Sequence, residues 1–275
     1  MQTSTSNFGE IGGPQQHSHP GYTTVHTSMH QQPQPHSNEP SDEFWLALMA
    51  LADNFYTQSP PNIKLCAHCL LCITVSNPPP KIEARTHLQL GSLFLKETIH
   101  LDRAESHLEK AMTLSSKING YTDCYFEAGS LLAKVYVFQK KTQDAVTLLQ
   151  TVYRDAQNSS YWNSRILFQL AQVAMDEGNL NAATHYLQTG EAECSNRFGA
   201  SYARILFKLG HGMLLLIQRE FVGVDAVLGA SSQLINCYND SPKNKEMCKI
   251  LFLIMQTCHF LYASQVFDFR KIKVN

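Results

Sequence analysis

Large and small residues alternate in this chain in a pattern that recurs at a long, regular interval. In each copy a large residue is followed at once by a small one, and a further residue of mostly apolar character stands three positions later. The copies are Leu90-Gly91-x-x-Phe94, Leu132-Ala133-x-x-Tyr136, Leu170-Ala171-x-x-Ala174 and Leu209-Gly210-x-x-Met213. The leading leucines are 42, 38 and 39 residues apart. Residues with this spacing share one face of an α-helix, so each copy predicts a helix.

A second pattern follows each copy of the first. It has a small residue, a large one four positions on, and another small or medium one three positions after that. Its copies are Ala104-x3-Leu108-x2-Ala111, Ala145-x3-Leu149-x2-Val152, Ala183-x3-Leu187-x2-Gly190 and a degenerate Val222-x3-Ala226-x2-Gly229. Two such helices per repeat, packed through small residues, are the tetratricopeptide signature. The sequence therefore predicts an all-α, tetratricopeptide-like solenoid of helical hairpins, wound as a right-handed superhelix.

The repeat array is expected to span residues 41–265, with about five hairpins and an unpaired last helix. Its leading helix begins at Ser41-Asp42-Glu43, where a capping residue and acids suit a helix N-terminus, and Ile63–Val75 is its partner. The last helix is expected at Lys245–Ala263. Residues 266–275 then read as a divergent, truncated end, because no further helix follows to pair with it.

Residues 1–40 differ sharply in composition from the rest. They are rich in His, Gln, Pro and Ser, contain no Lys or Arg, and have only two acidic residues, Glu10 and Glu39. A segment with so few apolar residues cannot form a packed core, so we expect a disordered tail. Its histidines are irregularly spaced and no cysteine stands among them, which does not favour a metal site.

Charge and hydropathy narrow the classes of partner. The formal net charge is −1, with 16% charged and 44% hydrophobic residues. A chain so close to neutral has no global field that attracts nucleic acid or a membrane surface, and no apolar run is long enough to span a bilayer. The low charge is compatible with a surface covered by a partner and equally with a plain neutral surface. Scattered cysteines without a disulfide-type spacing indicate a reducing compartment, cytosol or nucleus.

The candidate chemistry is sparse. Cys66-x2-Cys69-x2-Cys72 has the spacing of some iron–sulfur ligands, but it lies in an apolar helical segment, where buried cysteines act as small hydrophobes. We therefore expect structural cysteines, no metal and no cofactor, with an enzyme or metalloprotein as the competing hypothesis. The nucleophile, phosphate-loop and zinc-peptidase motifs are missing, so we expect no catalytic residues.

The remaining candidate site is a peptide-binding groove lined by the first helix of each hairpin. Positions five and two residues before the leading leucine, and two after it, flank the packed stripe and should face the groove. The expected lining residues are Arg85, Leu88, Lys134, Arg165, Phe168, Gln172, Arg204, Phe207 and His211. Arginines can pair bidentately with carboxylates and aromatic rings can anchor a ligand. This row predicts a groove for an extended peptide of acidic to neutral character.

Several undivided segments resemble one known family. They are Thr57–Cys66, Ile82–Gly91, Ser106–Ala111, Tyr161-Trp162, Leu167–Gln172 and Gly212–Ile217. Over roughly residues 43–265 the chain resembles the N-terminal half of the metazoan Mau-two chromatid cohesion factor family, the tetratricopeptide subunit of the cohesin loader.

The resemblance implies a non-enzymatic, nuclear and chromatin-associated scaffold without a cofactor. It also implies one direct partner, the extended N-terminal segment of the adherin or Nipped-B-like loader subunit, with cohesin and chromatin contacted indirectly. No small-molecule substrate, membrane or sequence-specific nucleic acid is expected. The alternative within binding proteins is a generic tetratricopeptide adaptor, although an adaptor for chaperone C-terminal peptides would need a groove clamp of Lys and Asn.

Overall fold

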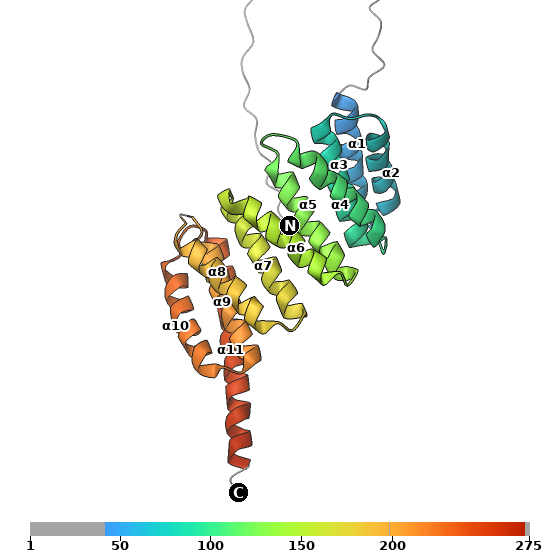
Figure 1. The fold of residues 1–275 in the computed structure, drawn as a ribbon. Coiled ribbons are helices and arrows are strands. Elements are labelled where there is room, and N and C mark those ends of the chain that lie inside the picture. The colour runs from blue at the N-terminus through green and yellow to red at the C-terminus, as the bar shows by residue number, and fades with distance from the viewer. Residues whose placement is uncertain (1–41, 198, 273–275) are drawn as a thin grey trace, which may run out of the picture. The chain divides into compact units, whose positions relative to one another are not determined.

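The structure, a computed structural model, describes residues 42–197 and 199–272. Within these ranges the chain forms helices and no strands, as predicted for an all-α fold (Figure 1). The predicted disordered tail over residues 1–40 lies outside the described residues, as do residues 273–275 of the expected divergent end.

The described helices follow one another as hairpins. The paired helices are α1 (Asp42–Thr57) with α2 (Ile63–Val75), α3 (Pro80–Glu97) with α4 (Leu101–Ser116), α5 (Thr122–Phe138) with α6 (Thr142–Asp155), α7 (Ser160–Asp176) with α8 (Leu180–Ser195), and α9 (Ser201–Gln218) with α10 (Phe221–Cys237). A short 3₁₀ turn, η1 (Ala156–Asn158), joins α6 to α7, and α11 (Pro242–Ile272) packs on α9 and α10.

Side-chain caps fix where several of these helices begin. The side-chain oxygen of Asn62 accepts a hydrogen bond from the backbone N–H of Leu65 at the start of α2. Asn179 does the same for α8, accepting from Ala182. The preceding Gly178 has φ +75°, a left-handed conformation that suits glycine. Such caps satisfy backbone donors that have no partner inside the helix, and they set the short turns within the hairpins.

The last helix differs from the prediction at both ends. It begins at Pro242, three residues before Lys245, and continues to Ile272 through most of the expected divergent end. The start is explained by Ser241-Pro242, since proline suits the first helical position and the Ser241 hydroxyl accepts from the Asn244 N–H at 3.4 Å.

Several successive first helices touch one another. Contacts join α3 to α5, α5 to α7 and α9 to α11. We call the surface made by α1, α3, α5, α7, α9 and α11 the first-helix face. Each second helix packs between its own first helix and the next one, as α4 does between α3 and α5.

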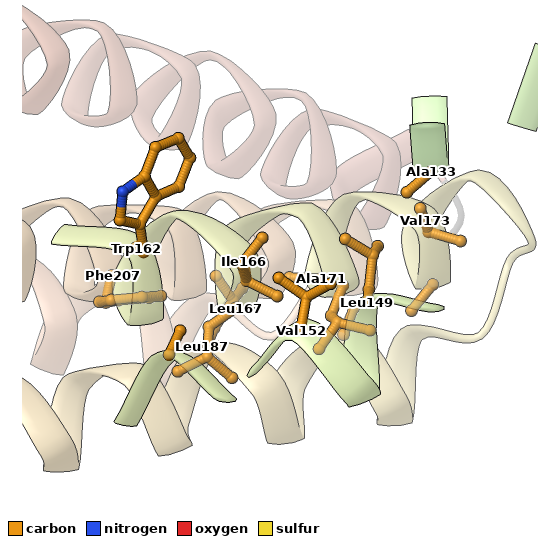
Figure 2. Packing of buried hydrophobic residues seen from close by; sticks show 14 of the residues in the cluster. Ala133, Leu149, Val152, Trp162, Ile166, Leu167, Ala171, Val173, Leu187 and Phe207 are labelled. Atoms are coloured by element: carbon orange, nitrogen blue, oxygen red, sulfur yellow. The ribbon is translucent and has the colours of Figure 1, made fainter. Parts of the chain in front are cut away.

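Small residues allow neighbouring helices to approach closely, both within a hairpin and between successive hairpins. A Cβ atom added to Gly91 of α3 would lie 2.5 Å from Leu108 Cγ of α4. In the central cluster, apolar side chains of α6, α7, α8 and α9 interlock (Figure 2). There a Cβ on Gly190 of α8 would lie 2.3 Å from the Phe207 ring. Phe207 is fully buried and stacks on Phe168, with ring centroids 3.9 Å apart.

The fourth repeat is out of register with the prediction by two residues. The close-approach glycine of α9 is Gly212, whose added Cβ would lie 2.8 Å from Val227 of α10 and 2.5 Å from Met255 of α11. In α10 the expected inward residue Val222 is 86% exposed. The buried set is Val224-x3-Leu228-x2-Ser231, which has the same spacing as the second pattern of the other repeats. Both helices are therefore shifted by two positions, and the leading position of the first helix falls on His211.

Replacing Gly190 with alanine should destabilise the fold. At an exposed helical position, alanine is more favourable than glycine by about 1 kcal/mol. Here the added methyl group would meet the Phe207 ring, and Phe168, stacked on the other side of that ring, leaves it no room to move aside. We expect a net loss of about 1–3 kcal/mol in the free energy of unfolding, as in other overpacked cores. Gly229→Ala is the matched control in α10, since an added Cβ there meets nothing within 4 Å. The control should be neutral or stabilising in urea unfolding, and equal effects of the two changes would contradict this packing.

Two histidines pack between α3 and α4. The Nδ1 atoms of His87 and His107 lie 2.8 Å apart, and the His107 ring stacks on Phe94. Burial, with the nearby charges of His107 and Lys110, lowers the pKa of His87 from 6.5 to about 4. Burial also lowers the pKa of His107. The carboxylate nearest to His87 is Glu83, with its Oε1 atom 4.0 Å from Nε2.

The lowered pKa of His87 predicts a pH-dependent stability. In the unfolded chain the His87 imidazole binds a proton below about pH 6.5, whereas in the folded chain it does so only below about pH 4. Stability from the neutral imidazole is therefore complete above pH 6.5 and falls as the pH drops toward 4. The urea midpoint of the native protein should fall between pH 7 and pH 5 by more than that of His87→Gln. An identical fall in the two proteins would contradict the prediction.

Candidate functional site

Three recesses lie along the first-helix face. The N-terminal recess is formed by α1, α2 and α3 with Glu127 of α5, the central recess mainly by α5 and α7, and the apolar recess by α7, α9 and α11. Each is bounded by more than one first helix. A ligand that follows this face can therefore touch several repeats in turn.

The N-terminal recess holds the predicted Arg85 and Leu88. Arg85 lies 3.8 Å from Glu127, its counterpart in the next repeat, so its charge is partly compensated. Leu88 is only 3% exposed and belongs to the core beneath the recess. The recess also contains Gln89, whose buried Oε1 accepts no hydrogen bond from the described residues.

The central recess contains the predicted Lys134 and Gln172, both exposed. Gln169 forms its wall and is fixed by Ser130: the Ser130 hydroxyl donates to Gln169 Oε1 at 2.7 Å, and Gln169 Nε2 donates to the Ser130 carbonyl at 3.0 Å. Asp176 also borders the recess. Lys134 and Gln172 thus stand on a rigid α5–α7 contact.

Two further cations lie near Lys134 of the central recess. Burial lowers the pKa of Lys134, and the nearby charges of Arg165 and Lys96 lower it further. Arg165 donates from Nη1 to the Tyr161 hydroxyl at 2.8 Å, and its guanidinium lies 5.1 Å from the Trp162 ring centroid. Among the described residues no carboxylate forms an ion pair with Lys96, Lys134 or Arg165.

The apolar recess has an open volume of about 360 Å³. It is lined by Phe168, Leu206, Leu209, Gly210, Met213, Leu251 and Ile254. Of the predicted residues, only Phe168 is found here. Its ring is held against Phe207, so the base of the recess is rigid.

Three predicted groove residues of α9 line none of the three recesses. Phe207 is fully buried in the core. Arg204 lies close to Cys194 of α8, where burial raises the pKa of the thiol and the charges of Arg197 and Arg204 oppose that rise. His211 lines a polar hollow beside α8 and α10, away from the first-helix face. All three placements follow from the shift of two residues in the fourth repeat.

The corrected register finds the residues that the sequence analysis missed. Counting from His211, the positions five before, two before and two after are Leu206, Leu209 and Met213, and all three line the apolar recess. The signal was present in α10, where Leu228 supplies the large central residue of the second pattern and Ala226 does not. Lys96, at the end of α3, lay outside the three positions considered.

The candidate metal cysteines lie in different surroundings. Cys66 is buried, Cys69 is half-buried and Cys72 is exposed. Burial raises the pKa of the Cys66 and Cys69 thiols, which disfavours the thiolate form that binds metals. In the part of the chain that the structure describes, no group of three or more His, Cys, Asp or Glu side chains is placed to hold a metal ion. Likewise, none of the described helices is both long and apolar enough to cross a membrane.

The fold defines a class: a tetratricopeptide-like repeat protein. Known structures agree on the fold. Kinesin light chain TPR-like repeats of Podosopora anserina superpose with a TM-score of 0.56 at 14% identity, covering 71% of this chain and 97% of that one. PilF of Pseudomonas aeruginosa gives 0.51 at 18% identity, covering 82% and 91%. These likenesses confirm the predicted fold class.

Sequence comparison then gives the family. The sequence model of the cohesin loading factor family matches residues 45–270, and the chain belongs to that family. Curated relatives named MAU2 chromatid cohesion factor homolog are 36% identical over 225 residues in Drosophila virilis and over 226 residues in Drosophila melanogaster. Both matches cover 82% of this chain, but 36% and 35% of the relatives, so the chain spans about a third of their length. The predicted family is confirmed.

Proposed function

We propose that this chain is a non-catalytic scaffold in cohesin loading, which holds an extended segment of a partner protein along its first-helix face. The observation that carries the proposal is the row of three recesses across successive first helices. Membership of the cohesin loading factor family supports the process. The names of the relatives support a role in chromatid cohesion.

The proposed partner is the N-terminal segment of a Nipped-B-like loader subunit, with cohesin and chromatin reached through it. An extended segment suits the site because it exposes side chains and backbone groups at short intervals. Lys134 in the central recess, with the charge of Arg165 nearby, suits the acidic side chains of such a segment. Membership of the cohesin loading factor family supports a location in the nucleus, at chromatin.

A scaffold fits the described residues better than an enzyme does. Of the paired histidines His87 and His107, the first is buried and the second half-buried, and burial lowers the pKa of both, which favours the neutral rings. His87 and His107 contact each other where α3 packs on α4, so their role is in the packing of that hairpin. The few cations near the central recess form only a small basic patch, whereas nucleic-acid binding needs an extended basic stripe.

The proposal predicts that the partner segment binds and that charge in the central recess matters. The native chain should co-purify with the N-terminal segment of a Nipped-B-like protein. Lys134→Glu with Arg165→Glu should weaken its affinity by about tenfold or more, since each reversal replaces an attraction with a repulsion. Titration by fluorescence anisotropy measures the effect.

The matched control makes the same charge change elsewhere. Lys64→Glu with Arg103→Glu alters exposed residues of α2 and α4 that line none of the three recesses. This control should bind like the native chain, and both double variants should keep the native helical circular dichroism. Failure of the native chain to bind the segment, or equal weakening in the two variants, would refute the proposed function.

A further inference from the structure

The first-helix face changes character along its length. Lys134 lines the central recess, the charges of Arg165 and Lys96 lie near it, and none of the three cations forms an ion pair with a carboxylate of the described residues. The neighbouring recess, on α7, α9 and α11, is lined by apolar side chains. The corrected register of α9 produces this contrast, because it brings Leu206, Leu209 and Met213 to the face in place of Arg204, Phe207 and His211.

The apolar recess selects a large apolar side chain. Met213 is 38% exposed, Leu251 37% and Ile254 50%, which is unusual for a cluster of large hydrophobic residues. A charged side chain entering this recess would lose water and gain no hydrogen bond from its lining, which is costly. An aliphatic or aromatic side chain would gain by burial. Methionine at the rim can adjust to its shape.

Building on the proposed function, we propose that the bound segment has two parts: a large apolar side chain seated in the apolar recess, and an acidic residue over Lys134 and Arg165. Lys134 and Arg165 lie on α5 and α7, next to the apolar recess along the same face. One ligand can therefore reach both, and an acidic residue of that ligand would complement the two cations. Packed helices are about 10 Å apart, and the two recesses are one to two helices apart. An extended chain advances about 3.3 Å per residue. The acidic residue therefore lies about three to six residues from the apolar one.

Photo-crosslinking tests both halves of the motif in the complex. The full chain carries p-benzoylphenylalanine in place of Met213 in one sample and in place of Gln172 in another. The probe is the N-terminal segment of a Nipped-B-like protein, and mass spectrometry locates the crosslinks. Met213 should join a stretch that contains Leu, Ile, Phe, Met or Trp. Gln172 should join a stretch that contains Asp or Glu, about three to six residues away.

Affinity measurements give an independent check. Met213→Asp should weaken binding about tenfold or more, because it places a charge in the apolar recess, whereas Met213→Leu should bind like the native chain. Met247→Asp is the matched control: Met247 is 45% exposed and lines none of the three recesses. Thermal melts of each variant show whether the fold is intact.

The outcomes separate this inference from the proposed function. If the segment binds but Met213 joins only stretches without a large apolar residue, or joins residues of this chain itself, the inference is overturned and the scaffold function stands. The same holds if Met213→Asp and Met247→Asp bind equally well. If no complex forms with the native chain, both fail.

Discussion

The close approach of paired helices through small residues is the constraint on which the rest of the structure depends. At Gly91, Gly190 and Gly212, a single added methyl group would overlap a side chain of a neighbouring helix. This contact fixes how each hairpin is rotated about its axis. The rotation in turn decides which side chains of the first helix reach the first-helix face. A shift of two residues in the contact therefore changes the chemistry of the surface.

The sequence was sufficient for the fold and for three of the four repeats. Leu90, Leu132 and Leu170 are all buried at the packed stripe. Of the predicted flanking residues, Lys134 and Gln172 line the central recess and Phe168 lines the apolar recess, whereas Arg165 lines none of the three. The prediction for the fourth repeat was wrong because Leu209-Gly210 also matches the large–small pattern. In the structure, His211-Gly212 occupies those two positions. The discriminating residue lies in the partner helix, where a large Leu228 is buried and a small Ala226 is exposed.

Burial depends on contacts between hairpins, which a repeat pattern alone does not describe. Phe207 was predicted to line the groove because of its position relative to Leu209. It is buried because Gly190, in the preceding hairpin, leaves room for its ring. Arg85 stands at the predicted position, yet Glu127 from the next repeat shares its charge. The effective cations are Lys96, Lys134 and Arg165, which come from three different helices and so belong to no single repeat position.

The central claim is that the partner lies along the first-helix face, and thiol footprinting tests it most directly. Exposed Cys72 and Cys237 are first changed to serine. Single cysteines are then placed at Gln172 and Met213 on the face, and at Thr184 beside the polar hollow of α8 and α10. Addition of the partner segment should slow alkylation at Gln172 and Met213 and leave Thr184 unchanged. Protection at Thr184 with free reaction at Gln172 and Met213 would contradict the account.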